Sequence, residues 1–510
     1  MSTPASIPWF VRHEVTLAWR DWMSMMTAGR AVRERVVGLV VLAVIAGLHV
    51  LAYSILRAPF AAGINADKPT LMVLTGIALL SFALMLSQAI ESITRAFYTR
   101  SDLDLILSSP ASARHLFAVR IAAIVMSTAS LSALIGAPFV TIAILLDGWC
   151  WLSVYPAILA LAALATALSL AATVAMFCTI GARHTRFVAQ VIAAVVGAGF
   201  LIGTQVIGIL YYGSYSRLAV FQADGIIAGA PGADSIAWIP ALALMGQPAA
   251  LGALFAFASA ALILAVVVFS GSFGNWVMEA AGVAENTGRI RTHERPFQVF
   301  KASSALRRKE WQLLARDPWL VSQSLMQILY LIPPAVLLWQ KYGTEAGVVV
   351  ILSPVLVMAV GQLAGGLAWL AISGEDAPDL VATAPLPRNA VITAKIQAVL
   401  LVIAVTAGPL VLLMISANLW AGLATGLGVA VASASAVAIQ LWFQSESRRS
   451  NFRRRQTASR TATFAEAFSS ILWAGTTAFG AAGSWFAVVF GLLAVIVLAL
   501  ARYASPRGSQ

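Results

Sequence analysis

The chain has 510 residues, of which 60% are hydrophobic and only 11% are charged, and its formal net charge is +12. A soluble domain carries about 25% charged residues, so this composition excludes a soluble globular protein and indicates a chain whose solvent is lipid. The basic residues fall in short segments between apolar stretches, which argues against nucleic acid as a partner. Neither Cys150 nor Cys178 belongs to a CxxC pair, so the sequence gives no support for metal or redox chemistry.

The apolar stretches carry the main architectural signal, because a membrane-spanning helix needs about 20 such residues. We predict an all-α polytopic membrane protein of about twelve transmembrane helices. The predicted spans are residues 36–57, 70–93, 117–146, 151–180, 187–210, 250–273, 320–340, 346–372, 390–416, 419–444, 463–481 and 484–503. They divide the chain into two tandem six-helix bundles, residues 1–273 and 306–510, joined by a cytoplasmic linker at 274–305.

Lysine and arginine cluster in every second loop, and the positive-inside rule places those loops in the cytoplasm. The richest cluster is SRRSNFRRRQ at 447–456, which we expect to anchor to anionic lipid, whereas the alternate loops hold only Lys68, Arg217 and Lys341. An even number of spans then leaves both termini cytoplasmic. The Ala-rich composition, with arginine used over lysine, favours a bacterial cytoplasmic (inner) membrane.

A polar segment precedes the first span of each unit, and the two segments share one spacing. The shared positions are Glu14, Arg20 and Asp21 in HEVTLAWRD and, 296 residues later, Glu310, Arg316 and Asp317 in KEWQLLARD. Wound as a helix, residues 9–26 place charged and apolar side chains on opposite sides, which is typical of an amphipathic elbow helix lying on the cytoplasmic leaflet. The alternative is a pair of basic anchors that only fix the topology.

The loop after the second span of each unit carries acids on a side of the membrane that is otherwise basic. Its landmarks are Asp102, Asp104, Pro110 and Arg114 in the first unit, and Glu375, Asp376, Asp379, Pro385 and Arg388 in the second. A base then enters the next span, and these two bases, Arg120 and Lys395, are 275 residues apart. Acids near the start of a short helix stabilise it, so each loop is predicted to form a capped helix that docks a soluble partner. Two ordinary solvated turns are the alternative.

Two matched landmarks in the same order indicate a duplicated unit of about half the chain. In a chain this apolar, a duplication favours a transporter with pseudo-twofold symmetry. The halves differ on the outer side, where residues 211–249 form a long connection with a semi-apolar stretch around Trp238 that we interpret as a re-entrant segment. The last two spans of the second half are joined within a few residues, near 480–484.

Polar residues inside the predicted spans are few. Gln88 and Glu91 lie late in the second span, and Gln362 has the corresponding place in the eighth. Intramembrane polar residues indicate function by default, so these three are candidates for a translocation path. Hydrogen bonding between helices is the alternative.

This order of elements resembles the type-2 permeases of ATP-binding-cassette exporters: an elbow, two spans, an acidic loop leading to a proline, a base entering the third span, and six spans in all. In that family the loop after the second span is a coupling helix that docks on the nucleotide-binding subunit. The resemblance implies an exporter permease with two units fused in one chain. The sequence has no GxxxxGK[ST] motif, so this chain would hold no cofactor, and a separate cytoplasmic P-loop ATPase in two copies would bind ATP and magnesium.

A twelve-span secondary transporter driven by an ion gradient is the alternative. Six plus six spans suit it, but ionisable residues for ion coupling are scarce inside the spans. A membrane enzyme or scaffold is less favoured, because no metal cluster or nucleophile–base pair is visible and the five histidines are scattered. The sequence leaves the substrate open between a lipid, an amphipathic drug, a peptide and a glycan.

Overall fold

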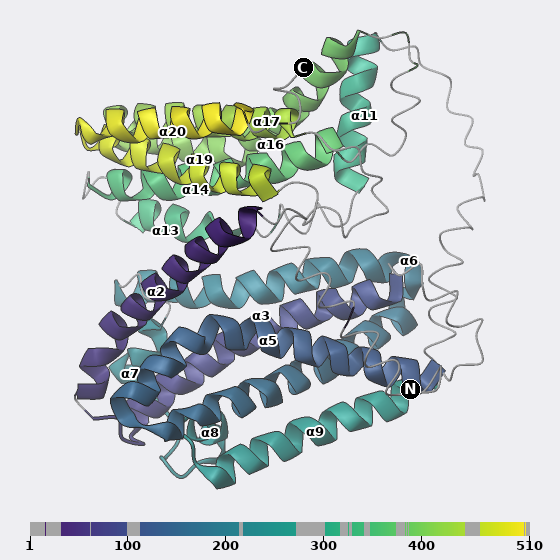
Figure 1. The fold of residues 1–510 in the computed structure, drawn as a ribbon, viewed down its shortest axis with the longest axis vertical. Coiled ribbons are helices and arrows are strands. Elements are labelled where there is room, and N and C mark those ends of the chain that lie inside the picture. Colours follow the sequence, from purple (N-terminus) through teal and green to yellow (C-terminus); the bar gives the residue numbers. More distant parts are fainter. Residues whose placement is uncertain are drawn as a thin grey trace. The chain divides into compact units, whose positions relative to one another are not determined.

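The computed structural model describes residues 16, 32–61, 63–98, 113–213, 218–271, 301–316, 325, 329–340, 347–373, 383, 385, 387–443, 460–503 and 505. Through these residues the chain is helical, without a strand, and it divides into two compact units, Met1–Arg291 and Thr292–Gln510 (Figure 1). The division falls inside the predicted linker 274–305. The two units are described in turn as unit 1 and unit 2.

Unit 1 is built on the long helices α3 and α6, which pack along each other. Its elements are α2 (Val32–Ala61), α3 (Lys68–Tyr98), α5 (Ala113–Asp147), η1 (Trp149–Ser153), α6 (Val154–Tyr212), η2 (Ala219–Gln222), α7 (Asp224–Gly229), η3 (Ile236–Trp238), α8 (Ile239–Leu244) and α9 (Pro248–Ser270). Met85, Val125, Leu161 and Leu254 belong to the apolar core that these helices share. Other large apolar side chains, such as Leu134 at 66% exposure, point outward, as lipid-facing residues do.

Helix α6 joins two predicted spans, 151–180 and 187–210, without a loop between them. Its 59 residues would measure about 88 Å, far more than the roughly 30 Å of a hydrocarbon core. The helix breaks at Gly181, where φ is 72° and ψ is 164°. Only glycine adopts that backbone conformation readily, so this residue separates the two apolar helices Trp149–Gly181 and His184–Tyr212.

The predicted outer connection of unit 1 is a packed segment of short helices, η2 to α8, gathered at one end of the unit (Figure 1). Trp238 is 3% exposed, and its indole N–H donates to the Gly232 carbonyl at 2.8 Å. A Cβ atom built on Gly76 of α3 would lie 2.5 Å from the Phe221 ring, so the segment sits directly against the α3 backbone. The stretch around Trp238 is thus packed against unit 1, and its interpretation as a re-entrant segment stays a prediction.

Unit 2 has a core of three helices, α14, α17 and α19, with α20 packed on α19 (Figure 1). Its elements are α11 (Ala302–Arg316), α13 (Ile332–Gln340), α14 (Gly347–Ser373), α16 (Arg388–Ala417), α17 (Leu419–Trp442), α19 (Arg460–Ala481) and α20 (Phe486–Tyr503). Small and hydroxylated residues let the three helices approach closely. The Ser353 and Thr425 hydroxyls are hydrogen-bonded at 2.6 Å, and a Cβ built on Gly428 would overlap the Thr477 hydroxyl.

The part of the chain that the structure describes holds nine helices long and apolar enough to cross a membrane, which makes the chain a polytopic membrane protein. They are Lys68–Phe97, Arg114–Asp147, Trp149–Gly181, His184–Tyr212, Pro248–Ser270, Leu352–Ile372, Asn389–Ala417, Leu419–Trp442 and Phe486–Tyr503. The predicted spans 36–57 and 463–481 lie within α2 and α19, and 320–340 overlaps α13, but none of these three is in the set. The total of twelve stays a prediction.

Candidate functional site

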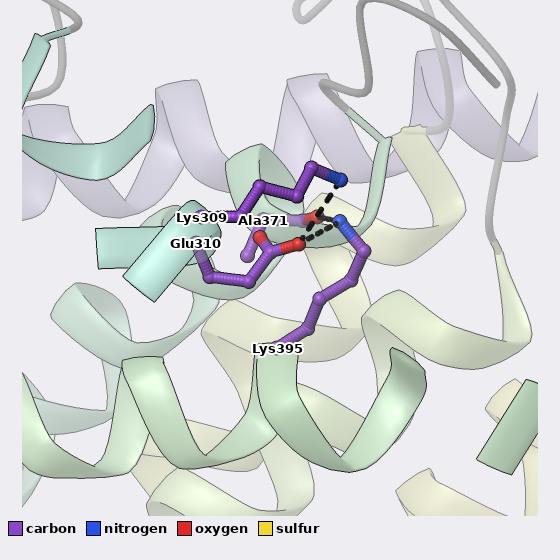
Figure 2. A network of polar contacts seen from close by, with 4 residues as sticks. All are labelled: Lys309, Glu310, Ala371 and Lys395. Atoms are coloured by element: carbon purple, nitrogen blue, oxygen red, sulfur yellow. Dashed lines mark hydrogen bonds and ion pairs between the residues drawn. The ribbon is translucent and has the colours of Figure 1, made fainter. Parts of the chain in front are cut away.

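A network of polar contacts ties α11, α14 and α16 together in unit 2 (Figure 2). Glu310 of α11 is 1% exposed, and its Oε1 lies 3.1 Å from the Lys395 ammonium of α16. Lys395 also donates a hydrogen bond of 2.6 Å to the carbonyl oxygen of Ala371, near the end of α14. A second lysine, Lys309, lies 3.4 Å from the same carboxylate oxygen. We call Lys309, Glu310, Lys395 and the Ala371 carbonyl the Glu310 network.

Apolar packing between α11 and α16 lies beside the Glu310 network. Leu306, one turn before Glu310, packs in a cluster with Val391, one turn before Lys395, and with Ala394, the residue next to Lys395. A helix of alternating apolar and charged positions such as α11 buries one side in this way and leaves Arg307 and Arg308 exposed. Helix α11 also runs across the bundle rather than along it (Figure 1). Its buried acid therefore fixes a helix that lies across the ends of two others.

Burial decides how much the ion pair contributes to the structure. Exposed ion pairs contribute little, but removing one partner of a buried pair leaves an uncompensated charge and costs about 3–5 kcal/mol. Glu310 and Lys395 are nearly inaccessible to solvent, at 1% and 9% for their side chains. Neither partner can therefore be removed alone without leaving a buried charge, and the bond to Ala371 adds α14 to the contact between α11 and α16.

Unit 1 repeats one contact of this network at the matching positions. Arg120 of α5 is 4% exposed and donates through Nη1 to the carbonyl oxygen of Ala96 in α3, at 3.4 Å. In both units the base follows the accepting residue by 24 positions. Arg120 and Lys395 are 275 residues apart, the offset that the acidic loops also show. Each contact brings together the two helices that flank the acidic loop of its own unit.

The predicted elbow residues are described in part. Glu310 is the buried centre of the network, and Arg316 is the last residue of α11. Glu14, Arg20, Asp21 and Asp317 lie outside the described residues. Residues 302–316 thus form the helix α11, and the elbow role on the membrane surface stays a prediction for both segments.

The predicted docking residues are also described in part. Arg114 is exposed in the first turn of α5, Pro385 is exposed in a bend, and Arg388 is the first residue of α16. Asp102, Asp104, Pro110, Glu375, Asp376 and Asp379 lie outside the described residues. The docking role of these loops is thus a prediction that rests on the sequence and on the contacts at the ends of the loops.

The three residues predicted to line a path have different surroundings. Gln88 is half-buried in α3, and Gln362 is exposed on α14. Glu91 pairs with Arg95 one turn along α3, and both side chains are largely exposed. None of the three belongs to the Glu310 network, so the structure separates the predicted path residues from the predicted loop contacts.

Sequence reasoning singled out Glu310 and Lys395 but did not foresee that they meet. It also missed Glu466 of α19, whose carboxylate accepts a hydrogen bond from the Gln440 side chain of α17. The signal that could have found it is a single acid inside the predicted span 463–481.

No group of three or more metal-ligating side chains occurs within the described ranges of the chain. No family model matches the sequence, and neither curated proteins nor solved structures gave a match.

Proposed function

We propose that the chain is the membrane-spanning permease subunit of an ATP-driven exporter, coupling ATP hydrolysis by a separate nucleotide-binding subunit to substrate translocation. The observation that carries the proposal is the Glu310 network. Ala371 lies two residues before the end of α14, and Lys395 lies in the second turn of α16. Their hydrogen bond joins the two ends of segment 374–387, which carries the predicted docking acids.

This arrangement suits the transmission of force from a docked protein. A push on segment 374–387 would reach α14 and α16 together, because Lys395 holds one to the other. Glu310 extends the same connection to α11. A soluble partner can move the helices only if the loop that it contacts is rigidly attached to them. A loosely attached loop would move by itself and would not pass the motion on to the helices.

Unit 1 has the same kind of contact at the ends of its own acidic loop, which supports a docking role for that loop as well. The contact from Arg120 to Ala96 joins the ends of segment 99–112 in the way that Lys395 joins the ends of segment 374–387. The proposal therefore assigns one docking loop to each of two duplicated units. Two loops predict two copies of the ATPase, which would bind ATP and magnesium themselves.

The proposed setting is a bacterial cytoplasmic membrane with both termini in the cytoplasm. In that orientation the two acidic loops face the compartment that contains ATP. The basic segments beside them would contact anionic lipid headgroups. The twelve-helix count and the two elbows belong to this proposal as well.

Isolation of the tagged chain from its native host in mild detergent tests the proposal. We expect a P-loop ATPase to co-purify at about two copies per chain, the stoichiometry that two docking loops imply. Charge reversal at both loops, Asp104→Lys with Asp379→Lys, is expected to abolish that association. Asp224→Lys, the same reversal in the outer segment, is the matched control.

Two results would count against the proposal. Unchanged binding of the ATPase by the double variant would remove the docking role from these loops. A chain that comes out alone, and that moves substrate in liposomes under an ion gradient without ATP, would establish the secondary transporter instead.

A further inference from the structure

Aromatic side chains gather in unit 2 where α19 ends and α20 begins. The Phe479 ring contacts the rings of Phe486 and Phe490, with centroids 5.7 and 5.1 Å apart. The Trp485 ring stacks on Phe486 at 4.2 Å. Trp485 is nevertheless 68% exposed, and Phe486 is exposed as well, so the cluster covers the end of the two helices and keeps a large apolar surface of its own.

A second exposed tryptophan lies at the same end of the unit. Trp420, the second residue of α17, is 65% exposed and donates its indole N–H to the Gly480 carbonyl of α19 at 2.9 Å. The connection from Gly480 to Trp485 contains no ionisable residue. Tryptophan, with an apolar ring and one polar N–H, is enriched where lipid tails meet headgroups. This end of the unit therefore has the composition of a membrane boundary.

The opposite ends of α17 and α20 carry the side chains expected of a second boundary. Arg502 and Tyr503 are the last residues of α20, and both are exposed. The Arg502 guanidinium lies 5.7 Å from the ring centroid of Trp442, the last residue of α17. Tyrosine and tryptophan favour this zone of a bilayer, and the long arginine side chain can reach from it into the headgroups.

The distance between the two boundaries matches the thickness of a bilayer. The 18 residues of α20 measure about 27 Å, and the 22 positions from Trp420 to Trp442 measure about 33 Å. A hydrocarbon core is about 30 Å thick. Between the boundaries α17 exposes Leu423 and Leu427. The exposed apolar side chains of α20 include one at every fourth position: Val488, Leu492, Ile496 and Leu500.

Helix α19 has an apolar exposed side of the same kind, although its hydropathy is lower. Phe464, Phe468 and Ile471 are exposed and follow one another at helical spacing, so they share one face. The acid of this helix, Glu466, lies on the other side, where it accepts a hydrogen bond from Gln440 of α17 and lies against α14. The 22 residues of α19 measure about 33 Å, as α17 does between its tryptophans.

We propose that the exposed sides of α17, α19 and α20 form one lipid-contacting surface, and that Trp420 and Trp485 anchor its end at the headgroup level of a phospholipid bilayer. The Trp485 indole N–H can donate to a lipid ester carbonyl or phosphate oxygen while its ring stays on Phe486. A protein partner would require neither an apolar length equal to the hydrocarbon thickness nor aromatic rings at both of its limits. The occupant of this surface is therefore lipid.

This inference goes beyond the proposed function and does not rest on it, because it concerns the contact of unit 2 with the bilayer and not with an ATPase. It assigns α19 to the membrane together with the two helices beside it. It also assigns a level in the bilayer to individual residues, with Trp485 at one headgroup boundary and Tyr503 at the other.

The depth of nitroxide spin labels tests the surface. Cys150 and Cys178 are first replaced by serine, because both are exposed. The full chain is then labelled at one new cysteine and reconstituted in vesicles of phosphatidylcholine and phosphatidylglycerol. The four single variants follow the exposed face of α20: Val488→Cys, Leu492→Cys, Ile496→Cys and Leu500→Cys.

The accessibility of each label to oxygen, relative to a water-soluble nickel complex, measures its depth. We expect the two central labels, at 492 and 496, to be deepest, and the labels at 488 and 500 to be about 6 Å shallower. Immobilised labels that neither reagent reaches would show that protein covers this face and would overturn the inference. A depth that increases steadily toward 488 would place Trp485 inside the hydrocarbon and overturn its anchoring role.

Removal of the tryptophans tests the anchor itself. Trp420→Ala with Trp485→Ala should move the label of Val488→Cys deeper into the hydrocarbon, because the uncharged connection beside it loses its contacts with the headgroups. Trp473→Phe is the matched control, since the Trp473 indole donates to Ser435 within the unit, and it should leave the depth unchanged. An unchanged depth in the double variant would overturn the anchor. The four labels above retain both tryptophans, so their depths do not depend on the folding of this variant.

Discussion

Units 1 and 2 share one contact near their acidic loops and differ at two other places. Both use a buried base to bond a carbonyl oxygen on the helix before the loop. Ile90, however, which lies 275 residues before Gly365, belongs to an apolar cluster with Met176, Ala189 and Ala193, where unit 2 places the Glu466 carboxylate.

The second difference lies in the connection before the last helix of each unit. In unit 1 the chain from α6 to α9 folds into four short helices, whereas in unit 2 the turn from Ala481 to Phe486 joins α19 to α20. The shared contact thus lies at the ends of the acidic loops. The two differences lie elsewhere in the units.

The largest effect is expected from breaking the Glu310 network. Lys395→Met leaves a buried carboxylate without its main partner, and we expect a loss of about 3–5 kcal/mol in the free energy of unfolding, measured by denaturation in mixed micelles. Lys309, which lies 3.4 Å from the same carboxylate oxygen, would still compensate part of the charge and favours a loss at the low end of that range. Adding Glu310→Gln should restore most of the stability. A single variant as stable as wild type would show that the ion pair does not hold α11.

A charge exchange in unit 1 tests whether Arg120 has an acidic partner, as Lys395 does in unit 2. Glu14 precedes Glu310 by 296 residues as Arg120 precedes Lys395 by 275, so the sequence predicts Glu14 as the acid for Arg120. Arg120→Glu should destabilise the protein, and added Glu14→Arg should recover it with a coupling energy of roughly 1–3 kcal/mol. The double-mutant cycle is the measurement. Additive effects would mean that the units share the carbonyl contact alone.

The first of the two differences, at Gly365, can be tested by filling the space of this glycine. Gly365→Ala forces a methyl group against Glu466, and overpacking of this kind costs about 1–3 kcal/mol. Gly252→Ala on α9 is the control, because a Cβ there has no atom within 4 Å. Thermal unfolding of both variants decides the matter, and equal transition temperatures would contradict the close approach of α14 to α19.

The smallest effect is expected at the first residues of α3, near the short helices of unit 1. The Asp67 carboxylate accepts from the Thr70 backbone N–H at 3.1 Å, and hydrogen bonds from Thr70, first from its side chain, hold the pKa of Asp67 below the ordinary 3.8. Asp67→Ala should cost about 1 kcal/mol at neutral pH.

The pH dependence of this cap has a definite sign. A lowered pKa means that the contribution is complete above pH 3.8 and is lost as the pH falls through the folded value. Asp67→Asn keeps an acceptor that does not titrate in this range and should remove the dependence. An identical acid response in wild type and Asp67→Asn would show that the cap does not contribute.

Much of the helical architecture could be predicted from apolar length. Helices α3, α5 and α16 each contain a predicted span, and α9, α14, α17 and α20 each match one to within three residues at either end. The fusion of two spans into α6 could not be predicted, because Gly181 could equally have begun a loop. Helix α19 carries Glu466 and several hydroxyl groups, which lower its hydropathy, and it is not among the nine helices apolar enough to cross a membrane within the described residues.

The site was predictable to a lesser extent, because it depends on contacts distant in the sequence. Repeated spacing identified Glu310 and Lys395, but a pairing of residues 85 positions apart in the chain has no local signal. The bond to Ala371 uses a backbone carbonyl, which no side-chain pattern reveals. Glu466 was visible as an acid in an apolar stretch, but Gln440 and Gly365 become its neighbours only when three helices come together.

Gly181 is a break of a single residue between two helices of unit 1, with no loop beside it. Two apolar helices meet there at one residue, so a rotation of one must be taken up by that residue or passed to the other. In unit 2 the equivalent step from α17 to α19 spans residues 443–459. One backbone position thus sets the angle between two helices of unit 1, and a side chain at 181 would change that angle without touching any other residue.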